Sequence, residues 1–322
     1  MFLRAQGGAG GPGPDGAAGT LGTPRSVGAG CAALFWAVGF YGVADLLALV
    51  GARGGMDAVA GLQASWGVLF TLIVGGGFVA MAARPLNPWP ALVQLWTVAA
   101  ALLLAAALTA NVDPLVVAIM LVPMTAVGFA GPRLPPRRKL EADGLLFLLA
   151  LAGAPAWWSY AAVAVERSLT PGVEDDVSWG LAHWPLQAAR GIFMALIVLV
   201  MEFWPPGRPL HGTVCCASST VLAAGWLLYP VSAGSVDSPA MSVLAVLWGA
   251  AVFACRFRGT GGGRTGGRPA AVDGPKPPGL RTEAPAAGAG RGPVRARLPR
   301  GTGRPWPDTE VLWPDTAGPR NA

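Results

Sequence analysis

The chain has 322 residues, of which 53% are hydrophobic and 12% are charged, and its mean hydropathy is +0.51. In soluble domains about a quarter of the residues are charged, so this composition excludes an ordinary soluble domain and indicates a membrane protein. The formal net charge is +6, from 23 Lys and Arg against 17 Asp and Glu. Residues 1–256 hold 12 side chains of each sign, whereas residues 257–322 hold 11 basic and 5 acidic ones, so the excess positive charge lies in the C-terminal tail.

The predicted elements begin after a glycine-rich stretch. Residues 1–26 lack the charged start and short apolar core of a signal peptide and are predicted to form a disordered cytoplasmic N-terminus. Residues 27–257 are predicted to form a transmembrane domain, because a helix of about 20 apolar residues crosses about 30 Å of hydrocarbon. Eight apolar runs meet this length: 29–50, 62–83, 89–110, 114–131, 144–165, 184–204, 212–232 and 238–256. The expected fold is an all-α integral membrane protein with about eight transmembrane helices.

The connections between these runs differ in basic residues, which predicts the orientation of the chain. If the N-terminus is cytoplasmic, the outer connections carry only Arg53 and Arg167. The inner segments then carry nine basic residues: Arg4, Arg25, Arg84, Arg133, Arg137, Arg138, Lys139, Arg208 and Arg256. We therefore expect a multi-pass protein of the plasma membrane with both termini in the cytoplasm.

The sixth run contains the candidate ligand site. An arginine at the centre of a span costs about 2.5–3.5 kcal/mol, so Arg190 should have a compensating partner. His183, Gln187 and Arg190 fall at helical spacing and project from one face. In the predicted topology, Asp45 lies at a comparable depth and Glu166 ends the fifth span on the same side. These five residues predict a site for an anionic or polar ligand, anchored by Arg190.

A simpler interpretation of Arg190 remains open and is favoured. Its side chain can extend to the outer headgroups, with His183-Trp184 serving as an interfacial anchor. Helix-interrupting residues also have a functional and a purely structural interpretation. They occur at Gly75-Gly76-Gly77, Pro123 and Gly153-Ala154-Pro155. Broken helices expose backbone groups to substrates in transporters, but small residues also allow close helix packing, which is the favoured interpretation.

Sequence motifs for catalysis or metal binding are missing. The stretch Gly259–Thr265 lacks the lysine of a phosphate loop, and Asp175-Asp176 is best interpreted as a solvated acidic loop. The four cysteines show no Cys-x-x-Cys spacing and are expected to be buried free thiols. We therefore expect no cofactor and no metal, and the sequence favours a protein that is not an enzyme.

Residues 258–322 are rich in Arg, Gly and Pro and are predicted to form a disordered cytoplasmic tail. Its arginines could contact anionic lipid headgroups, whereas nucleic acid is disfavoured because acidic residues are interspersed and the tail is tethered to a membrane. The sequence Trp-Pro-Asp-Thr occurs twice, starting at Trp306 and at Trp313. It could dock a cytoplasmic protein, although chance repetition in a biased composition is the favoured interpretation.

The run Ala182-His183-Trp184-Pro185-Leu186-Gln187-Ala188-Ala189 opens an apolar helix in an alanine-rich multi-pass chain. It resembles segments of uncharacterised multi-pass membrane proteins of high-GC actinobacteria. This resemblance covers one helix start and the general composition, and it implies no activity, cofactor or site.

Two functions follow from these features. The first is a transporter-like or permease-like protein for a small polar solute or a lipid, since the sequence combines an embedded charge with interrupted helices. The alternative is a membrane scaffold or regulatory protein that recruits a cytoplasmic partner through its tail.

Overall fold

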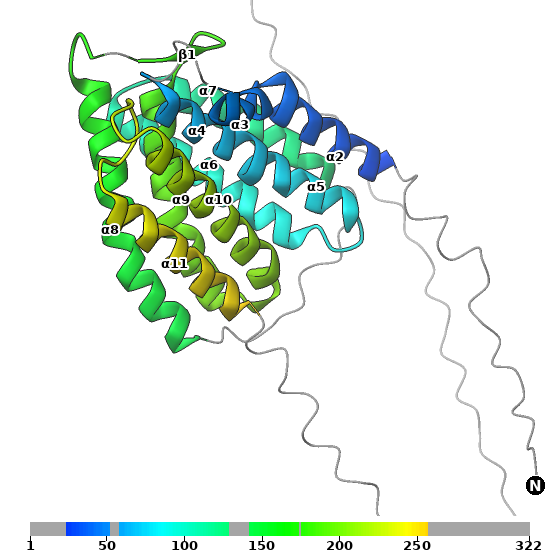
Figure 1. Cartoon of the computed structure of the whole chain (residues 1–322). Coiled ribbons are helices and arrows are strands. Elements are labelled where there is room, and N and C mark those ends of the chain that lie inside the picture. The colour runs from blue at the N-terminus through cyan, green and yellow to red at the C-terminus, as the bar shows by residue number, and fades with distance from the viewer. Residues whose placement is uncertain (1–23, 52–57, 129–141, 174, 257–322) are drawn as a thin grey trace, which may run out of the picture. The chain divides into compact units, whose positions relative to one another are not determined.

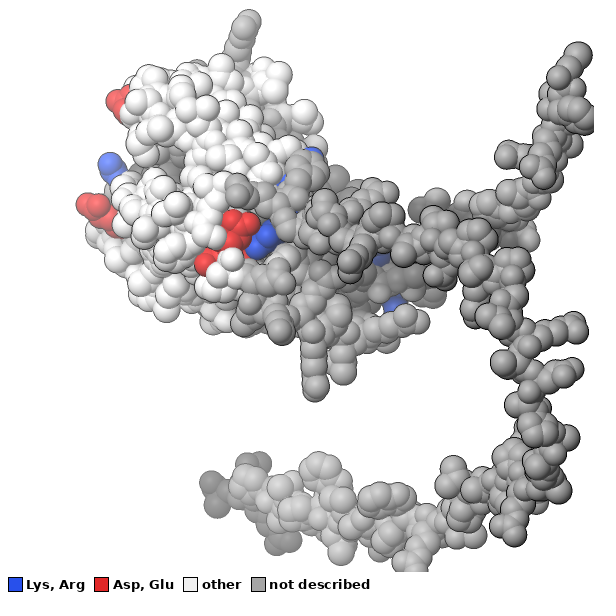
Figure 2. Space-filling view, turned by 90° about the horizontal axis from the view of Figure 1, so that it is seen from below, with Lys and Arg blue, Asp and Glu red and all other residues white. Residues whose placement is uncertain are grey.

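The computed structural model describes residues 24–51, 58–128, 142–173 and 175–256, and this part of the chain is mostly helical (Figure 1). The predicted tail and most of the predicted N-terminal segment lie outside the described residues. The first described helix, α2 (Pro24–Leu34), begins at Pro24, so Pro24, Arg25 and Ser26 belong to a helix and not to the N-terminal segment. Seen from below, the described surface carries few charged side chains, as expected for an apolar helical protein (Figure 2).

The first predicted span is broken. Helix α2 continues as the π-helical turn η1 (Phe35–Gly39), and α3 (Gly42–Gly51) follows at an angle of 50°. Tyr41, with φ of 61°, interrupts the helix, and the carbonyl of Phe40 accepts a hydrogen bond from Trp66 Nε1 at 2.8 Å. The expectation of one continuous helix over 29–50 was therefore wrong. The helix can break at this point because the indole of Trp66, on the next helix, supplies a hydrogen bond to the Phe40 carbonyl.

The second predicted span is confirmed as one helical rod, formed by α4 (Ala60–Gly67), the π-helical turn η2 (Val68–Gly75) and α5 (Gly76–Ala83). A π-helical turn displaces backbone groups from their regular partners. Gln94 of α6 (Trp89–Thr109) compensates this, because its Nε2 donates to the carbonyl of Ile73 at 2.7 Å. The three glycines at 75–77 therefore do not break the helix, and Gly77 lies against Leu95 of α6.

The fourth predicted span is shorter than expected. Helix α7 covers Asp113–Met124 and passes into the 3₁₀ turn η3 (Thr125–Gly128) just after Pro123. Twelve residues rise about 18 Å, which is less than the hydrocarbon thickness. The proline explains the end of the helix, since it removes a backbone donor and clashes with the preceding turn.

Helix α8 (Gly144–Leu169) runs through Pro155 without a break, so the Gly-Ala-Pro sequence allows close packing here. Asp143 caps the start of α8, because its Oδ1 accepts from the backbone N–H groups of Leu145 and Leu146. The connection that follows contains a small antiparallel pair, β1 (Val177–Ser178) and β2 (Leu181–Ala182), which an all-α prediction omits.

Helix α9 (His183–Phe203) is the most buried of the candidate spans and packs against α4, α6, α7, α8 and α10. The 3₁₀ turn η4 (Pro205–Gly207) leads into α10 (Arg208–Leu228), and α11 (Pro239–Cys255) packs along α10. Ser238 caps α11 by accepting from the backbone N–H of Met241.

Five helical segments of the described chain are long and apolar enough to cross a membrane, and six if the bent pair α2–α3 counts as one span. These segments indicate a membrane protein, but α7 and the 17-residue α11 fall short of the length criterion, so the expected total of eight is not reached. The qualifying segments are 60–83, 89–109, 144–169, 183–203 and 205–228.

Candidate functional site: a buried arginine beside an amphipathic pocket

Helix α9 buries all three residues of its predicted polar face. His183, Gln187 and Arg190 are each at most 2% exposed, and Arg190 is 0% exposed. Arg190 therefore does not extend to the headgroups, as the simpler interpretation of the sequence required. Glu166 is exposed near the end of α8 and does not share the burial of these three residues.

His183, at the start of α9, belongs to a separate cluster. Its ring stacks on Trp66, with centroids 4.3 Å apart, and its Nδ1 lies 3.6 Å from the Asp176 carboxylate. Asp175 Oδ1 accepts from the His183 backbone N–H at 3.2 Å, which caps α9. The acidic pair that the sequence assigns to a solvated loop therefore folds back onto a helix end. Partial burial raises the pKa of the Asp175 carboxyl above its ordinary value.

Asp45 lies in the first turn of α3, where a carboxylate interacts favourably with the helix dipole. It is half-buried, and its electrostatic neighbour is Asp176. No ion pair joins Asp45 to Arg190 among the described residues. The structure thus places Asp45 with the acidic loop, and Asp45, one of the two candidate partners of Arg190, does not pair with it.

Arg190 contacts an aromatic ring. Its guanidinium carbon lies 4.5 Å from the centroid of the Tyr160 ring in α8. Within the described chain, none of its three side-chain nitrogens makes a hydrogen bond of good geometry, and no carboxylate forms an ion pair with it. A cation–π contact contributes about 2 kcal/mol when desolvated, well below the penalty for burying an ion, so Arg190 is incompletely compensated.

Arg208 shows how this protein compensates a buried arginine elsewhere. It is 4% exposed, donates to the carbonyls of Met201 and Glu202 at 2.9 and 3.0 Å, and lies 3.4 Å from the Asp143 carboxylate. Arg208 and Arg190 are therefore buried to a similar extent but differ in the acceptors and carboxylates around their guanidinium groups.

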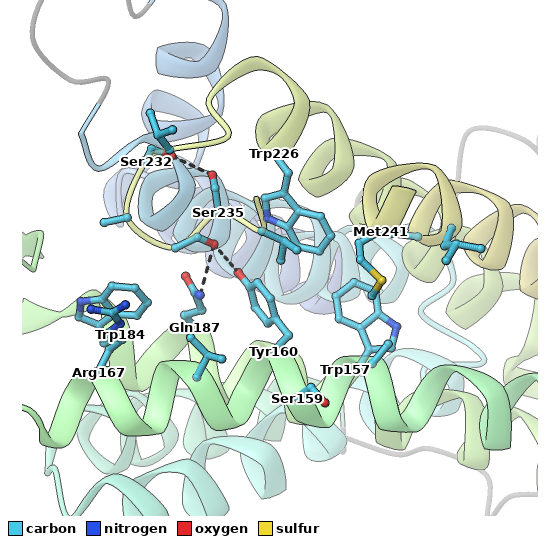
Figure 3. A pocket seen from close by; sticks show the side chains of 18 of the residues that line it. Trp157, Ser159, Tyr160, Arg167, Trp184, Gln187, Trp226, Ser232, Ser235 and Met241 are labelled. Carbon is cyan, nitrogen blue, oxygen red and sulfur yellow. Dashed lines mark hydrogen bonds between the residues drawn. The ribbon is translucent and has the colours of Figure 1, made fainter. Parts of the chain in front are cut away.

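Tyr160, whose ring contacts Arg190, also lines a cavity of about 980 Å³ (Figure 3). The polar end of this cavity is built around the carbonyl of Gly234. The Tyr160 hydroxyl donates to it at 3.3 Å, and Gln187 Nε2 donates to it at 3.4 Å. The left-handed φ of 82° at Gly234 suits glycine, and a Cβ there would lie 2.6 Å from the Gln187 amide oxygen.

The loop that carries Gly234 connects α10 to α11 and is held by the start of α4. Ser232 Oγ accepts from the Gly61 N–H at 3.0 Å, and the Ala233 carbonyl accepts from the Leu62 N–H at 2.9 Å. These bonds satisfy two of the backbone donors left free at a helix start. The polar end of the pocket is therefore a fixed part of the fold.

The opposite end of the pocket is apolar and aromatic. Trp157 of α8 lies 6.3 Å from Trp226 of α10 and 5.7 Å from Trp248 of α11, measured between ring centroids. Figure 3 shows Trp157 and Met241 at this end and Gln187 at the other. The pocket thus has the two-part lining that an amphiphile needs.

The pocket opens along α8 and α11. Val163 of α8 and Leu244 of α11 both line it and are 50% and 56% exposed. In a bilayer these side chains would face acyl chains, so the opening is suited to a molecule that enters sideways.

Of the five predicted ligand-binding residues, Gln187 alone lines the pocket. Trp157 is typical of an interfacial aromatic belt, yet it is buried in a helix contact. One signal was present, because Trp157 and Tyr160 have the spacing of one helix face. The predicted partner-binding residues Trp306 and Trp313 lie outside the described residues.

Among the described residues, no group of three or more His, Cys, Asp or Glu side chains could hold a metal ion. Comparisons with protein-family models, with curated proteins and with solved structures found no match to this chain.

Proposed function

We propose that this chain is a transporter-like membrane protein that binds a lipid-like amphiphile in the pocket between α8, α10 and α11. The observation that carries the proposal is the pocket's lining, with Tyr160, Gln187 and the Gly234 carbonyl at one end and the indoles of Trp157 and Trp248 at the other. Its volume of about 980 Å³ lies at the upper end of the range of small-molecule sites. A freely soluble polar solute would leave the tryptophan end unfilled.

The opening between α8 and α11 supports lateral exchange with the bilayer. Exposed apolar side chains line this opening, so an acyl chain can remain in an apolar environment while it enters. We place the protein in the plasma membrane with both termini in the cytoplasm, on the basis of the nine-to-two distribution of basic residues.

Photo-crosslinking tests the binding site directly. The purified full chain is incubated with a lysolipid that carries a diazirine in its acyl chain, and the labelled peptides are mapped by mass spectrometry. We expect saturable labelling in residues 152–163 and 241–248. In Ala245→Phe the new ring fills the pocket and labelling there should fall, whereas Ala250→Phe, on an exposed position of α11 that does not line the pocket, should behave like the wild type.

Equal labelling of the two variants would contradict the proposed site. Lipid movement between leaflets is tested separately, with fluorescent lipids in proteoliposomes. The measured quantity is the fraction of the fluorescence that external dithionite quenches. Ala245→Phe should slow the exchange of lipid between leaflets, and Ala250→Phe should not.

A further inference from the structure

The Tyr160 hydroxyl lies at the meeting point of several donors. It gives its one hydrogen to the Gly234 carbonyl, and Ser65, Trp226 and Arg190 all direct donors at its oxygen. A hydroxyl that has donated its hydrogen presents only its lone pairs to other groups. The three neighbours can all donate, so donors surround a neutral oxygen.

The Tyr160 oxygen is the acceptor that these donors share, and their geometry toward it is poor. Ser65 Oγ, Trp226 Nε1 and the three guanidinium nitrogens of Arg190 make no hydrogen bond of good geometry to another described residue. Ser65 and Arg190 are at most 2% exposed, so bulk water does not replace the missing partners. Buried donors without acceptors are costly, and a buried cation without a counter-charge is more so.

We propose that the amphiphile's headgroup is an anion, a carboxylate or phosphate, which displaces the Tyr160 hydroxyl and binds to Arg190, Ser65 and Trp226. This inference rests on the proposed function, because the pocket supplies the route to the donors. Tyr160 and Trp226 both line the pocket, and the Arg190 guanidinium lies 4.5 Å behind the Tyr160 ring. A rotation of one side chain therefore joins the buried cation to the pocket.

The geometry suits an oxyanion in particular. A guanidinium presents paired N–H groups that match the two oxygens of a carboxylate or phosphate. The indole N–H and the serine hydroxyl add donors, and no carboxylate of the described chain pairs with Arg190. A neutral headgroup would leave the charge of Arg190 uncompensated.

The test compares two diazirine lysolipids with the same acyl chain, a lysophosphatidic acid and a neutral monoglyceride, on the full-length protein. We expect half-maximal labelling of residues 152–163 at a concentration at least about tenfold lower for the anion, as a charge-assisted hydrogen bond implies. Arg190→Gln should abolish this preference. The matched variant Arg84→Gln, which removes an exposed positive charge at the end of α5, should keep it.

Tyr160→Phe is the second variant. If the hydroxyl occupies the anion's position, its removal should leave anion binding equal or tighter. Weakening as large as that of Arg190→Gln would make the hydroxyl a ligand and overturn the displacement. Equal labelling by both lysolipids in the wild type would overturn the anionic class while the amphiphile pocket stands, and labelling by neither would end the proposed function itself.

Inorganic phosphate separates the two sources of the anion. If the headgroup alone binds the donors, millimolar phosphate should compete with the lysophosphatidic acid in the wild type but not in Arg190→Gln, which supports the anion site. If binding also requires the acyl chain, phosphate should not compete. The tenfold lower labelling concentration of the lysophosphatidic acid then supports the anion site by itself. Competition that persists in Arg190→Gln would overturn it.

Discussion

Trp248 of α11 lies directly against Gly153 of α8. Its indole N–H donates to the carbonyl of Leu149 at 2.9 Å, and a Cβ on Gly153 would overlap the indole nitrogen. This contact closes the aromatic end of the pocket. It also explains the glycine in the middle of α8, which permits the approach of a tryptophan from another helix.

Replacing Gly153 should therefore separate α8 from α11. We expect Gly153→Ala to lower the free energy of unfolding by about 1–3 kcal/mol, the usual cost of overpacking. The measurement is the thermal midpoint in detergent together with lysolipid labelling. Gly144→Ala is the matched control, because no atom lies within 4 Å of the added Cβ. Equal midpoints for the two variants would show that α11 does not depend on this contact.

The two buried arginines should respond in opposite directions. Arg208→Met removes an ion pair and two bonds to carbonyls and should destabilise the protein by about 3–5 kcal/mol. Arg190→Met removes a cation without a carboxylate partner and should be neutral or stabilising by about 1–4 kcal/mol in ligand-free protein. Thermal midpoints measure both. A large loss in Arg190→Met would mean that the cation–π contact with Tyr160 compensates it fully.

Gln94 should be required for the π-helical turn in the second span. Gln94→Leu leaves the carbonyl of Ile73 without its donor and should cost about 1–3 kcal/mol. Thr97→Val, one turn further along α6, removes a hydroxyl that bonds only to its own helix and should cost less. If the two variants unfold at the same temperature, the bond to Ile73 contributes no more than the control bond.

The pH dependence of stability should carry a contribution from Asp175. Its pKa is raised in the folded protein by burial, so the folded state binds this proton more tightly than the unfolded state. Its contribution to stability is therefore greatest at low pH and falls as the pH rises from about 3.8 through the raised pKa, then stays constant. The difference in thermal midpoint between wild type and Asp175→Asn, followed over this range, isolates the effect. A difference that does not change with pH would contradict it.

Deletion of residues 258–322 separates the transporter-like function from the scaffold alternative. The pocket is built from α8, α10, α11 and the loop before α11, so the deletion should leave lysolipid labelling and leaflet exchange unchanged. Loss of both with the fold intact would assign the function to the tail.

The sequence predicted the starts of helices well where a cap residue and a proline mark them. Asp113-Pro114 and Ser238-Pro239 stand at the starts of α7 and α11, as their helix-starting chemistry requires. The break at Phe40 and Tyr41 was not predictable, because both residues fit an apolar helix. The Phe40 carbonyl at the break accepts its bond from Trp66, 26 residues away in the sequence.

The candidate site was predicted in part for a similar reason. Helical spacing was enough to place His183, Gln187 and Arg190 on one face of α9. Their partners depend on how other helices pack, so the sequence did not identify Tyr160 or the loop around Gly234. Asp45 was placed beside Arg190 on the assumption of one straight first span, and the helix bends by 50° before α3.

The central claim is that an anionic amphiphile occupies the pocket with its headgroup at Arg190. An experimental structure of the full chain in lipid nanodiscs, with lysophosphatidic acid added, tests it most directly. We expect the phosphate within hydrogen-bonding distance of the Arg190 guanidinium, the Tyr160 ring turned aside and the acyl chain between Trp157 and Trp248. An empty pocket, with Tyr160 still bonded to Gly234 at saturating ligand, would contradict it.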